Sequence, residues 1–181
     1  MKNLIKQILK EYAEEQEKVL TIPSLKIFNY DWNALQQFLK SKGNPKWKIL
    51  SNLDLYEVPI ESLGNLTSVG GNLNLENTPI KSLGNLQSIE GYLNLNNTPI
   101  ISLGNLESVR GNMNLSNTPI KSLGNLTSVG GFLNLESSAA ESFGNLQSVG
   151  DYLNLYGTPL SHKYSREEIR QMVNVTNRIF K

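Results

Sequence analysis

The sequence predicts a parallel solenoid of stacked 20-residue coils, with helical segments at both ends. The stretch from Asn72 to Gly91 recurs with few changes at a fixed period of 20 residues. Within each coil the apolar residues hold fixed positions, and the flanking segments lack the repeat. We expect one structural domain with an N-terminal cap over 1–51, the solenoid over 52–160 and a C-terminal capping helix over 161–181. The six coils begin at Asn52, Asn72, Tyr92, Asn112, Phe132 and Tyr152.

Each coil contains the pattern of a strand with one buried face. In the second coil, apolar Leu73 and Leu75 alternate with polar neighbours, which predicts a strand over 72–76. Equivalent strands are expected over 92–96, 112–116, 132–136 and 152–156. After the strand Pro79 turns the chain, and apolar residues spaced by three then predict a 3₁₀-like or extended return leg. One buried column is expected from Leu73, Leu93, Met113, Leu133 and Leu153.

Small and polar residues recur at the corners of the coil. Glycine precedes most strands, where we expect a tight corner, and Asp151 takes that place once because Asp tolerates a left-handed backbone. The asparagine of each Leu-Gly-Asn-Leu corner is expected to serve the turn. The serine before that corner is expected to satisfy backbone groups rather than act as a nucleophile. These serines are Ser62, Ser82, Ser102, Ser122 and Ser142.

The spacing of these residues resembles the leucine-rich-repeat family. It is similar to the short bacterial repeats, and Leu66–Leu75 looks like the L domains of insulin-receptor-type ectodomains. The resemblance implies a right-handed parallel β-solenoid of leucine-rich-repeat type that binds a partner on its strand face. The coil is short, and threonine stands where the family has a buried Asn, so a nearly helix-free coil closer to a β-helix is the alternative. These threonines are Thr78, Thr98, Thr118 and Thr158.

Helical segments are expected to cover the open ends of the apolar core. An apolar stripe predicts a first helix over 3–19, and Asp31 is the expected N-cap of a second that stops at Gly43. Trp47–Leu50 is expected to begin the first rung. Ser165 and Glu168 form a capping box ahead of the C-terminal helix. The first dozen residues resemble the starts of many tailed-phage reading frames, which implies a viral protein in an infected host.

Charge and composition limit the classes of partner. Residues 52–160 carry three Lys or Arg and nine acids, a net charge of −6, between basic ends. This argues against nucleic acid lying along the array. The chain has no cysteine, no signal-peptide pattern and no apolar run of membrane-spanning length. We therefore expect an intracellular, cytoplasmic protein that is monomeric and does not insert into a membrane.

The outward strand positions form a grid that carries no Lys or Arg. Its aromatic side chains are expected to be exposed interface anchors that add nothing to solenoid stability, unless the C-terminal helix folds over them. Its central asparagines either form a hydrogen-bonded ladder or contribute to binding. The degenerate segment 137–140 is expected to leave a groove or a bend. The candidate binding residues are Tyr92, Phe132, Tyr152, Tyr156, Asn94, Asn134, Asn154, Glu76 and Glu136.

No catalytic, metal or cofactor site is expected. The chain has one histidine, His162, and lacks zinc spacing, a phosphate loop and a dinucleotide fingerprint. Glu76 and Glu136 would lie about 14 Å apart, too far for paired-carboxylate glycoside hydrolysis. We expect a non-enzymatic module that binds another protein. Glycan binding is the alternative, and binding to ice or another ordered surface, suggested by regular Thr and Asn columns, is the third.

Overall fold

A computed structural model describes residues 19–181 of the chain. The first helix expected over 3–19 falls almost wholly on residues 1–18 and lies outside the described residues. Within residues 19–181, no helix is long and apolar enough to cross a membrane.

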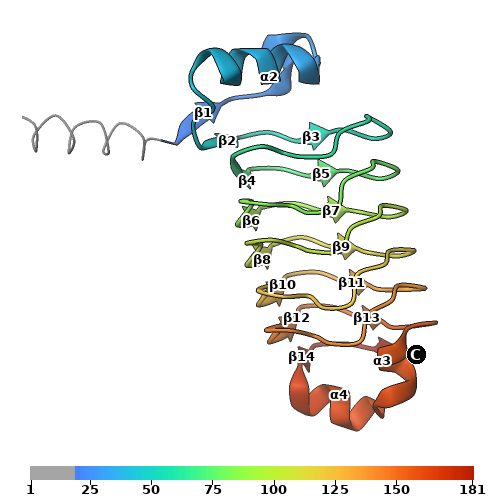
Figure 1. Cartoon of the computed structure of the whole chain (residues 1–181). Helices are drawn as coiled ribbons and strands as arrows, with labels where there is room; N and C mark the ends of the chain where they lie inside the picture. The colour runs from blue at the N-terminus through green and yellow to red at the C-terminus, as the bar shows by residue number, and fades with distance from the viewer. Residues whose placement is uncertain (1–18) are drawn as a thin grey trace, which may run out of the picture.

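The chain folds into a parallel β-solenoid of about five turns, with two columns of short strands stacked along its axis (Figure 1). The first sheet, sheet A, has the order β1-β2-β4-β6-β8-β10-β12-β14. Its strands are Leu20–Ile22, Trp47–Ile49, Leu66–Val69, Ser88–Ile89, Ser108–Val109, Ser128–Val129, Ser148–Val149 and Asn174–Val175. The second, sheet B, has the order β15-β13-β11-β9-β7-β5-β3. Its strands are, from β3 to β15, Leu53–Asp54, Leu73–Asn74, Leu93–Asn94, Met113–Asn114, Leu133–Asn134, Leu153–Asn154 and Ile179–Phe180.

The predicted register is confirmed. Residues 20 positions apart pair from rung to rung, so that Leu73 pairs with Leu93, and Leu93 with Met113. The expected buried column from Leu73 to Leu153 is wholly inaccessible to solvent. The sheet B strands are shorter than predicted, two residues each, and the return leg is extended rather than 3₁₀-like, because it forms sheet A.

Threonine and serine side chains satisfy backbone groups at the bends of each coil. The buried Thr78 hydroxyl donates to the Leu75 carbonyl at 2.7 Å, and the equivalent Thr98, Thr118 and Thr158 bonds are 2.6–2.7 Å long. At the next corner the Ser82 hydroxyl accepts a hydrogen bond from the Gly84 amide at 3.1 Å. This bond recurs in the other coils, as the sequence predicts for these serines.

The expectation that a left-handed backbone selects the residue before each strand is wrong. Gly91 does not have a positive φ. Instead, the side-chain oxygen of Asn72 occupies the place of a Cβ at Gly91, where it accepts a hydrogen bond from the Tyr92 amide at 2.8 Å. Asp151 replaces glycine where the preceding rung has Phe132 in place of Asn. Close approach of the rungs, rather than left-handed backbone, therefore selects glycine here.

The N-terminal end of the core is covered by the 3₁₀ helix η1 (Leu25–Phe28) and the helix α2 (Trp32–Ser41). Asp31 caps α2 as predicted, accepting hydrogen bonds from the amides of Asn33 at 2.7 Å and Ala34 at 3.1 Å. Trp32 of α2 packs against Trp47 of β2, with ring centroids 6.1 Å apart. Strand β1, which the sequence did not suggest, extends sheet A by one strand beyond β2.

The C-terminal capping helix expected over 161–181 is wrong in extent. Helices α3 (Pro159–Lys163) and α4 (Arg166–Met172) are short, and the remaining residues form β14 and β15, which add a rung to both sheets. The capping box of Ser165 and Glu168 is confirmed. Arg166 and Arg170 of α4 donate to the carbonyls of Ile179 at 3.0 Å and Val175 at 2.7 Å. These bonds occupy carbonyls in the last rung and protect the sheet edges.

Candidate binding surface on sheet B

Four aromatic rings lie in a line on the outer face of sheet B, and we refer to them as the aromatic row. The row consists of Tyr92, Phe132, Tyr152 and Phe180. Tyr92 and Phe132 have centroids 6.4 Å apart across the intervening rung. Phe132 and Tyr152 stack in parallel at 5.0 Å, and the Tyr152 ring meets Phe180 edge to face at 5.7 Å. The row runs along the solenoid axis and across the strands.

The structure corrects two expectations about these rings. Tyr92, Phe132 and Tyr152 are half-buried rather than exposed, and each packs against a neighbouring ring of the row. Burial also raises the pKa of the Tyr92 phenol, against a smaller opposite effect of its hydrogen bond with Asn114. The ring beyond Tyr152 is Phe180, which comes from a strand and not from a helix folded over the face. Tyr156 stands apart from the row and is 63% exposed.

The central asparagines act within their own coil rather than as a ladder. The side-chain oxygen of each accepts a hydrogen bond from the amide two residues ahead, as Asn134 does from Glu136 at 3.1 Å. The same bond forms at Asn74, Asn94, Asn114 and Asn154. No hydrogen bond joins two side chains of this column within residues 19–181 apart from Asn74 to Asp54. Most of the column therefore serves the turn after the strand.

The two predicted glutamates are held by amides of the following rung. Glu76 accepts hydrogen bonds from the side chains of Asn94 at 2.8 Å and Asn96 at 2.9 Å. Glu136 accepts one from Asn154 at 3.2 Å. The two bonds limit rotation of the Glu76 side chain, while the exposed Glu136 carboxylate is held by one longer bond.

A hollow of about 250 Å³ lies at the N-terminal end of the row. One Tyr, one Asp and several Asn side chains provide most of its wall, so it offers hydrogen-bond donors and acceptors around a single ring. Its lining residues are Asn52, Leu53, Asp54, Asn72, Asn74, Tyr92 and Asn94. Two of the predicted site residues, Tyr92 and Asn94, therefore border the same hollow.

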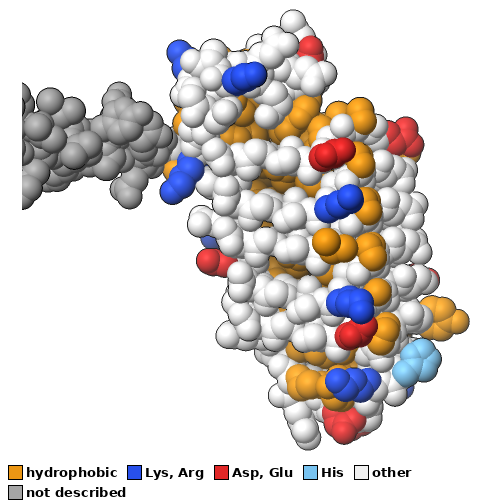
Figure 2. Space-filling model, in the orientation of Figure 1, with side chains coloured by type: hydrophobic (Ala, Val, Ile, Leu, Met, Phe, Trp, Pro, Cys, Tyr) orange, Lys and Arg blue, Asp and Glu red, His pale blue; other side chains and the backbone are white. Residues whose placement is uncertain are grey.

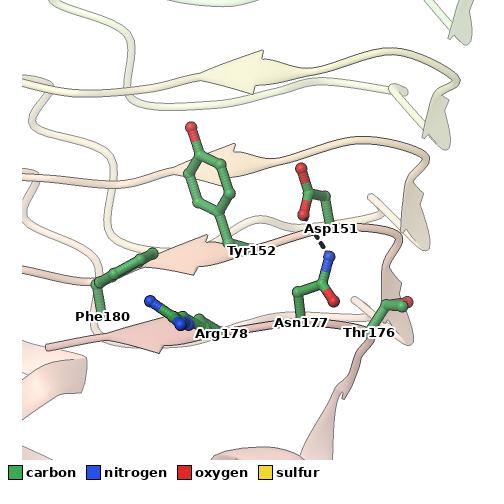
Figure 3. Close-up of a pocket in the computed structure, with 6 residues that line it drawn as sticks. All are labelled: Asp151, Tyr152, Thr176, Asn177, Arg178 and Phe180. Carbon is green, nitrogen blue, oxygen red and sulfur yellow. Dashed lines mark hydrogen bonds between the residues drawn. The ribbon is translucent and has the colours of Figure 1, made fainter.

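A larger hollow of about 450 Å³ lies at the C-terminal end, on the last two rungs, where the chain leads into the paired strands β13 and β15 (Figure 3). The Tyr152 ring extends toward the preceding rung and meets the Phe180 ring edge to face. The Arg178 side chain lies below Tyr152, on the chain that leads into β15. Asp151 accepts a hydrogen bond from the Asn177 amide group at 2.7 Å. The lining residues are Asp151, Tyr152, Thr176, Asn177, Arg178 and Phe180.

Sequence reasoning found only Tyr152 among these residues, because it placed 161–181 in a helix. The available signal was the four-residue spacing of Val175 and Ile179, which equals that of Val149 and Leu153 in the preceding coil. Those pairs are in register in the two sheets. The added rung also changes the charge of the face, since Arg178 is a cation at an outward position of sheet B.

The degenerate segment 137–140 keeps the path of the coil. Ser138 and Ala140 are buried at the positions that Thr and Ile hold in other coils. The Ser138 hydroxyl has no hydrogen-bond partner among the described residues.

Another face of the solenoid, turned to the viewer in Figure 2, carries a column of hydrophobic side chains with charged side chains of both signs beside it.

No group of three or more His, Asp or Glu side chains within residues 19–181 could hold a metal ion. His162 lies in α3, where Nδ1 is 3.0 Å from the Thr158 carbonyl oxygen. No protein-family model, curated protein or solved structure matches the chain.

Proposed function

We propose that this chain is a non-enzymatic recognition module that binds another protein through the outer face of sheet B. The proposal includes the finer form of the fold, a right-handed solenoid of leucine-rich-repeat type with six 20-residue coils and helical caps. In that class a concave strand face is the usual binding surface, and the fold analogy supports the proposal only together with the side chains on that face.

The observation that carries the proposal is the aromatic row. Rings aligned along the solenoid axis and packed against one another offer large apolar area, and Tyr is favoured as an anchor at protein interfaces. The carboxylates of Glu76 and Glu136, held by asparagine amides, lie beside the row. This combination favours a neutral or basic protein segment over nucleic acid.

Site-specific photocrosslinking tests the proposal directly. A benzoylphenylalanine at position 132 should crosslink the full chain to its partner in an extract of the source organism. The same group at Ile101, which is 63% exposed outside the row, is the control and should give no adduct. The double variant Tyr92→Asn/Phe132→Ser should remove partner capture. Asn is expected to be tolerated at position 92 because the facing residue of the next rung is Gly111, just as Gly91 faces Asn72. Adducts only from position 101 would refute binding through sheet B.

Glycan binding is the second candidate, and the hollow lined by asparagines around Tyr92 favours it. Amide groups can bond sugar hydroxyls while a ring packs against the apolar face of the sugar. A glycan array separates the two candidates, since Asn72→Ala should then abolish binding of the best glycan. The threonine column that suggested ice binding is buried, so it supplies no hydroxyl surface to ice. A thermal-hysteresis measurement tests that third idea.

A further inference from the structure

We propose that the hollow between β13 and β15 binds the carboxyl terminus of the partner protein, with the preceding residues of the partner extended along the aromatic row. This inference rests on the proposed function and specifies the partner segment that the surface accepts. It depends on the charge of the hollow, its aromatic wall and the positions of the two glutamates in the solenoid.

Arg178 supplies the charge that a carboxylate requires. Its backbone carbonyl accepts the Leu153 amide at 2.9 Å, which holds β15 in register, while its guanidinium forms no ion pair or hydrogen bond with another described residue. Asp151 lines the same hollow but is bonded to Asn177 and lies more than 4.0 Å from that guanidinium. A planar guanidinium binds a carboxylate through two parallel hydrogen bonds.

Tyr152 and Phe180 supply a place for the last side chain of the partner. Their rings meet edge to face at 5.7 Å and form two walls of the hollow, and Phe180 is 44% exposed. Thr176 and Asn177 add a hydroxyl and an amide at its rim. An apolar or aromatic terminal residue therefore fits beside a carboxylate held by Arg178, because the apolar and charged parts of the hollow are adjacent (Figure 3).

The residues that line this hollow are not those that the stacking of coils requires. Preceding rungs place Gly, or Ser in the first, where Asp151 stands, and Gly, Glu, Arg or Leu where Thr176 stands. The middle strand position, Asn or Asp in the preceding coils, is Phe180 in the last rung. Coils of the same fold thus form without these side chains, so the fold does not account for them.

The two glutamates fix the spacing of charges along the partner. Glu136 lies two rungs before β15 and Glu76 five rungs before it, roughly 10 and 24 Å at about 4.8 Å per rung. An extended chain advances about 3.3 Å per residue, so basic side chains are expected roughly three and seven residues before the carboxyl terminus. The Glu136 carboxylate would face the first of these and the Glu76 carboxylate the second.

Fluorescence anisotropy with a synthetic peptide tests the inference on the full chain. The probe has eight residues, with a carboxyl-terminal phenylalanine, lysines three and seven residues before it, serine elsewhere and a fluorophore at the amino end. The free acid should bind, and the carboxyl amide about tenfold more weakly, since a charge-assisted bidentate contact is lost. Arg178→Gln should weaken the acid to the level of the amide and leave the amide unchanged. Arg110→Gln, whose guanidinium pairs with Glu90 at 3.1 Å, is the matched control and should change neither.

Each alternative result has a distinct meaning. Equal affinity of acid and amide, or no binding of the acid, would overturn the carboxyl-terminus inference, and the proposed function would stand if position 132 still crosslinks to a protein. Binding of a polyuronate that Arg178→Gln abolishes, without binding of the peptide, would also overturn it and assign the hollow to an acidic saccharide. Thermal melts of Arg178→Gln should match those of the parent chain, because the replaced side chain has no bonded partner within residues 19–181.

Discussion

Asn94 should contribute more to stability than Asn134 of the same column, because it makes two hydrogen bonds and is only 8% exposed. Its oxygen accepts from the Asn96 amide at 3.2 Å and its amide group donates to the Glu76 carboxylate at 2.8 Å. The matched residue is Asn134, whose oxygen accepts from the Glu136 amide at 3.1 Å. The amide group of Asn134 makes no hydrogen bond with a described residue.

Replacement of each asparagine by alanine should therefore give unequal losses. A neutral hydrogen bond contributes about 1 kcal/mol, which sets the expected loss for Asn134→Ala. A hydrogen bond to a charged group contributes about 1.5–3 kcal/mol, and the partial exposure of Glu76 places it at the lower end. The loss for Asn94→Ala should thus be about 2.5 kcal/mol.

Urea unfolding followed by circular dichroism measures the two free energies of unfolding, with equal denaturant slopes as the condition for comparing them. The variant Glu76→Gln is a further control, because it keeps an acceptor for Asn94 and should recover part of the stability relative to Glu76→Ala. Equal losses of under about 1 kcal/mol for both asparagines would refute the reasoning and show that the bond from Asn94 to Glu76 adds no measurable stability.

Three further changes test the fold. Leu95→Asp should unfold the chain at room temperature, since a charge would be buried without a partner, and a retained circular dichroism spectrum would show that the strand faces are inverted. Gly104→Ala should lower the melting temperature more than Gly124→Ala, although both glycines have positive φ. A Cβ at Gly104 would lie 2.8 Å from the Gly84 nitrogen, while a Cβ at Gly124 meets no described atom within 4 Å. Equal shifts would show that only backbone strain matters. Hydrogen bonds from the Ser165 amide and hydroxyl lower the pKa of Glu168 below 4.5, so its stabilising effect should be present above pH 4.5 and be lost as the pH falls through the lowered value. Glu168→Gln should flatten this acid limb in thermal melts, and an unchanged limb would contradict it.

The fixed period made the register and the buried column predictable from the sequence, because every apolar position recurs at the same place in each coil. The last rung was not predicted from the sequence, for a physical reason. Ile169, Met172, Val173 and Thr176 follow Ser165 at helical spacing, and the capping box is real, so the local signal favours a longer helix. Pairing of Val175 with Val149 and of Ile179 with Leu153 overrides it, since strand pairing extends both sheets and buries the two side chains.

The candidate surface was predictable in composition but not in geometry. Tyr92, Phe132 and Tyr152 could be placed in one column from the repeat alone. Their mutual stacking, and the addition of Phe180 from the neighbouring column, depend on side-chain rotamers and on a rung that the sequence pattern does not announce. The bond from Asn94 to Glu76 also crosses from one column to another, which a column-by-column reading of the sequence does not detect.

Comparison of the coils with one another indicates what the rings of the aromatic row contribute. Where the first outward position is Asn, its oxygen accepts a hydrogen bond from the next rung, as Asn52 does from Asn72 and Asn112 from Phe132. Tyr92 and Phe132 cannot accept in this way, so each ring forgoes a bond of about 1 kcal/mol. An aromatic pair contributes about 0.5–1.5 kcal/mol of stabilisation, which roughly offsets that loss. The rings are thus close to neutral for folding, and a coil with Asn in their place already stacks, so stability does not explain why the chain carries them on this face.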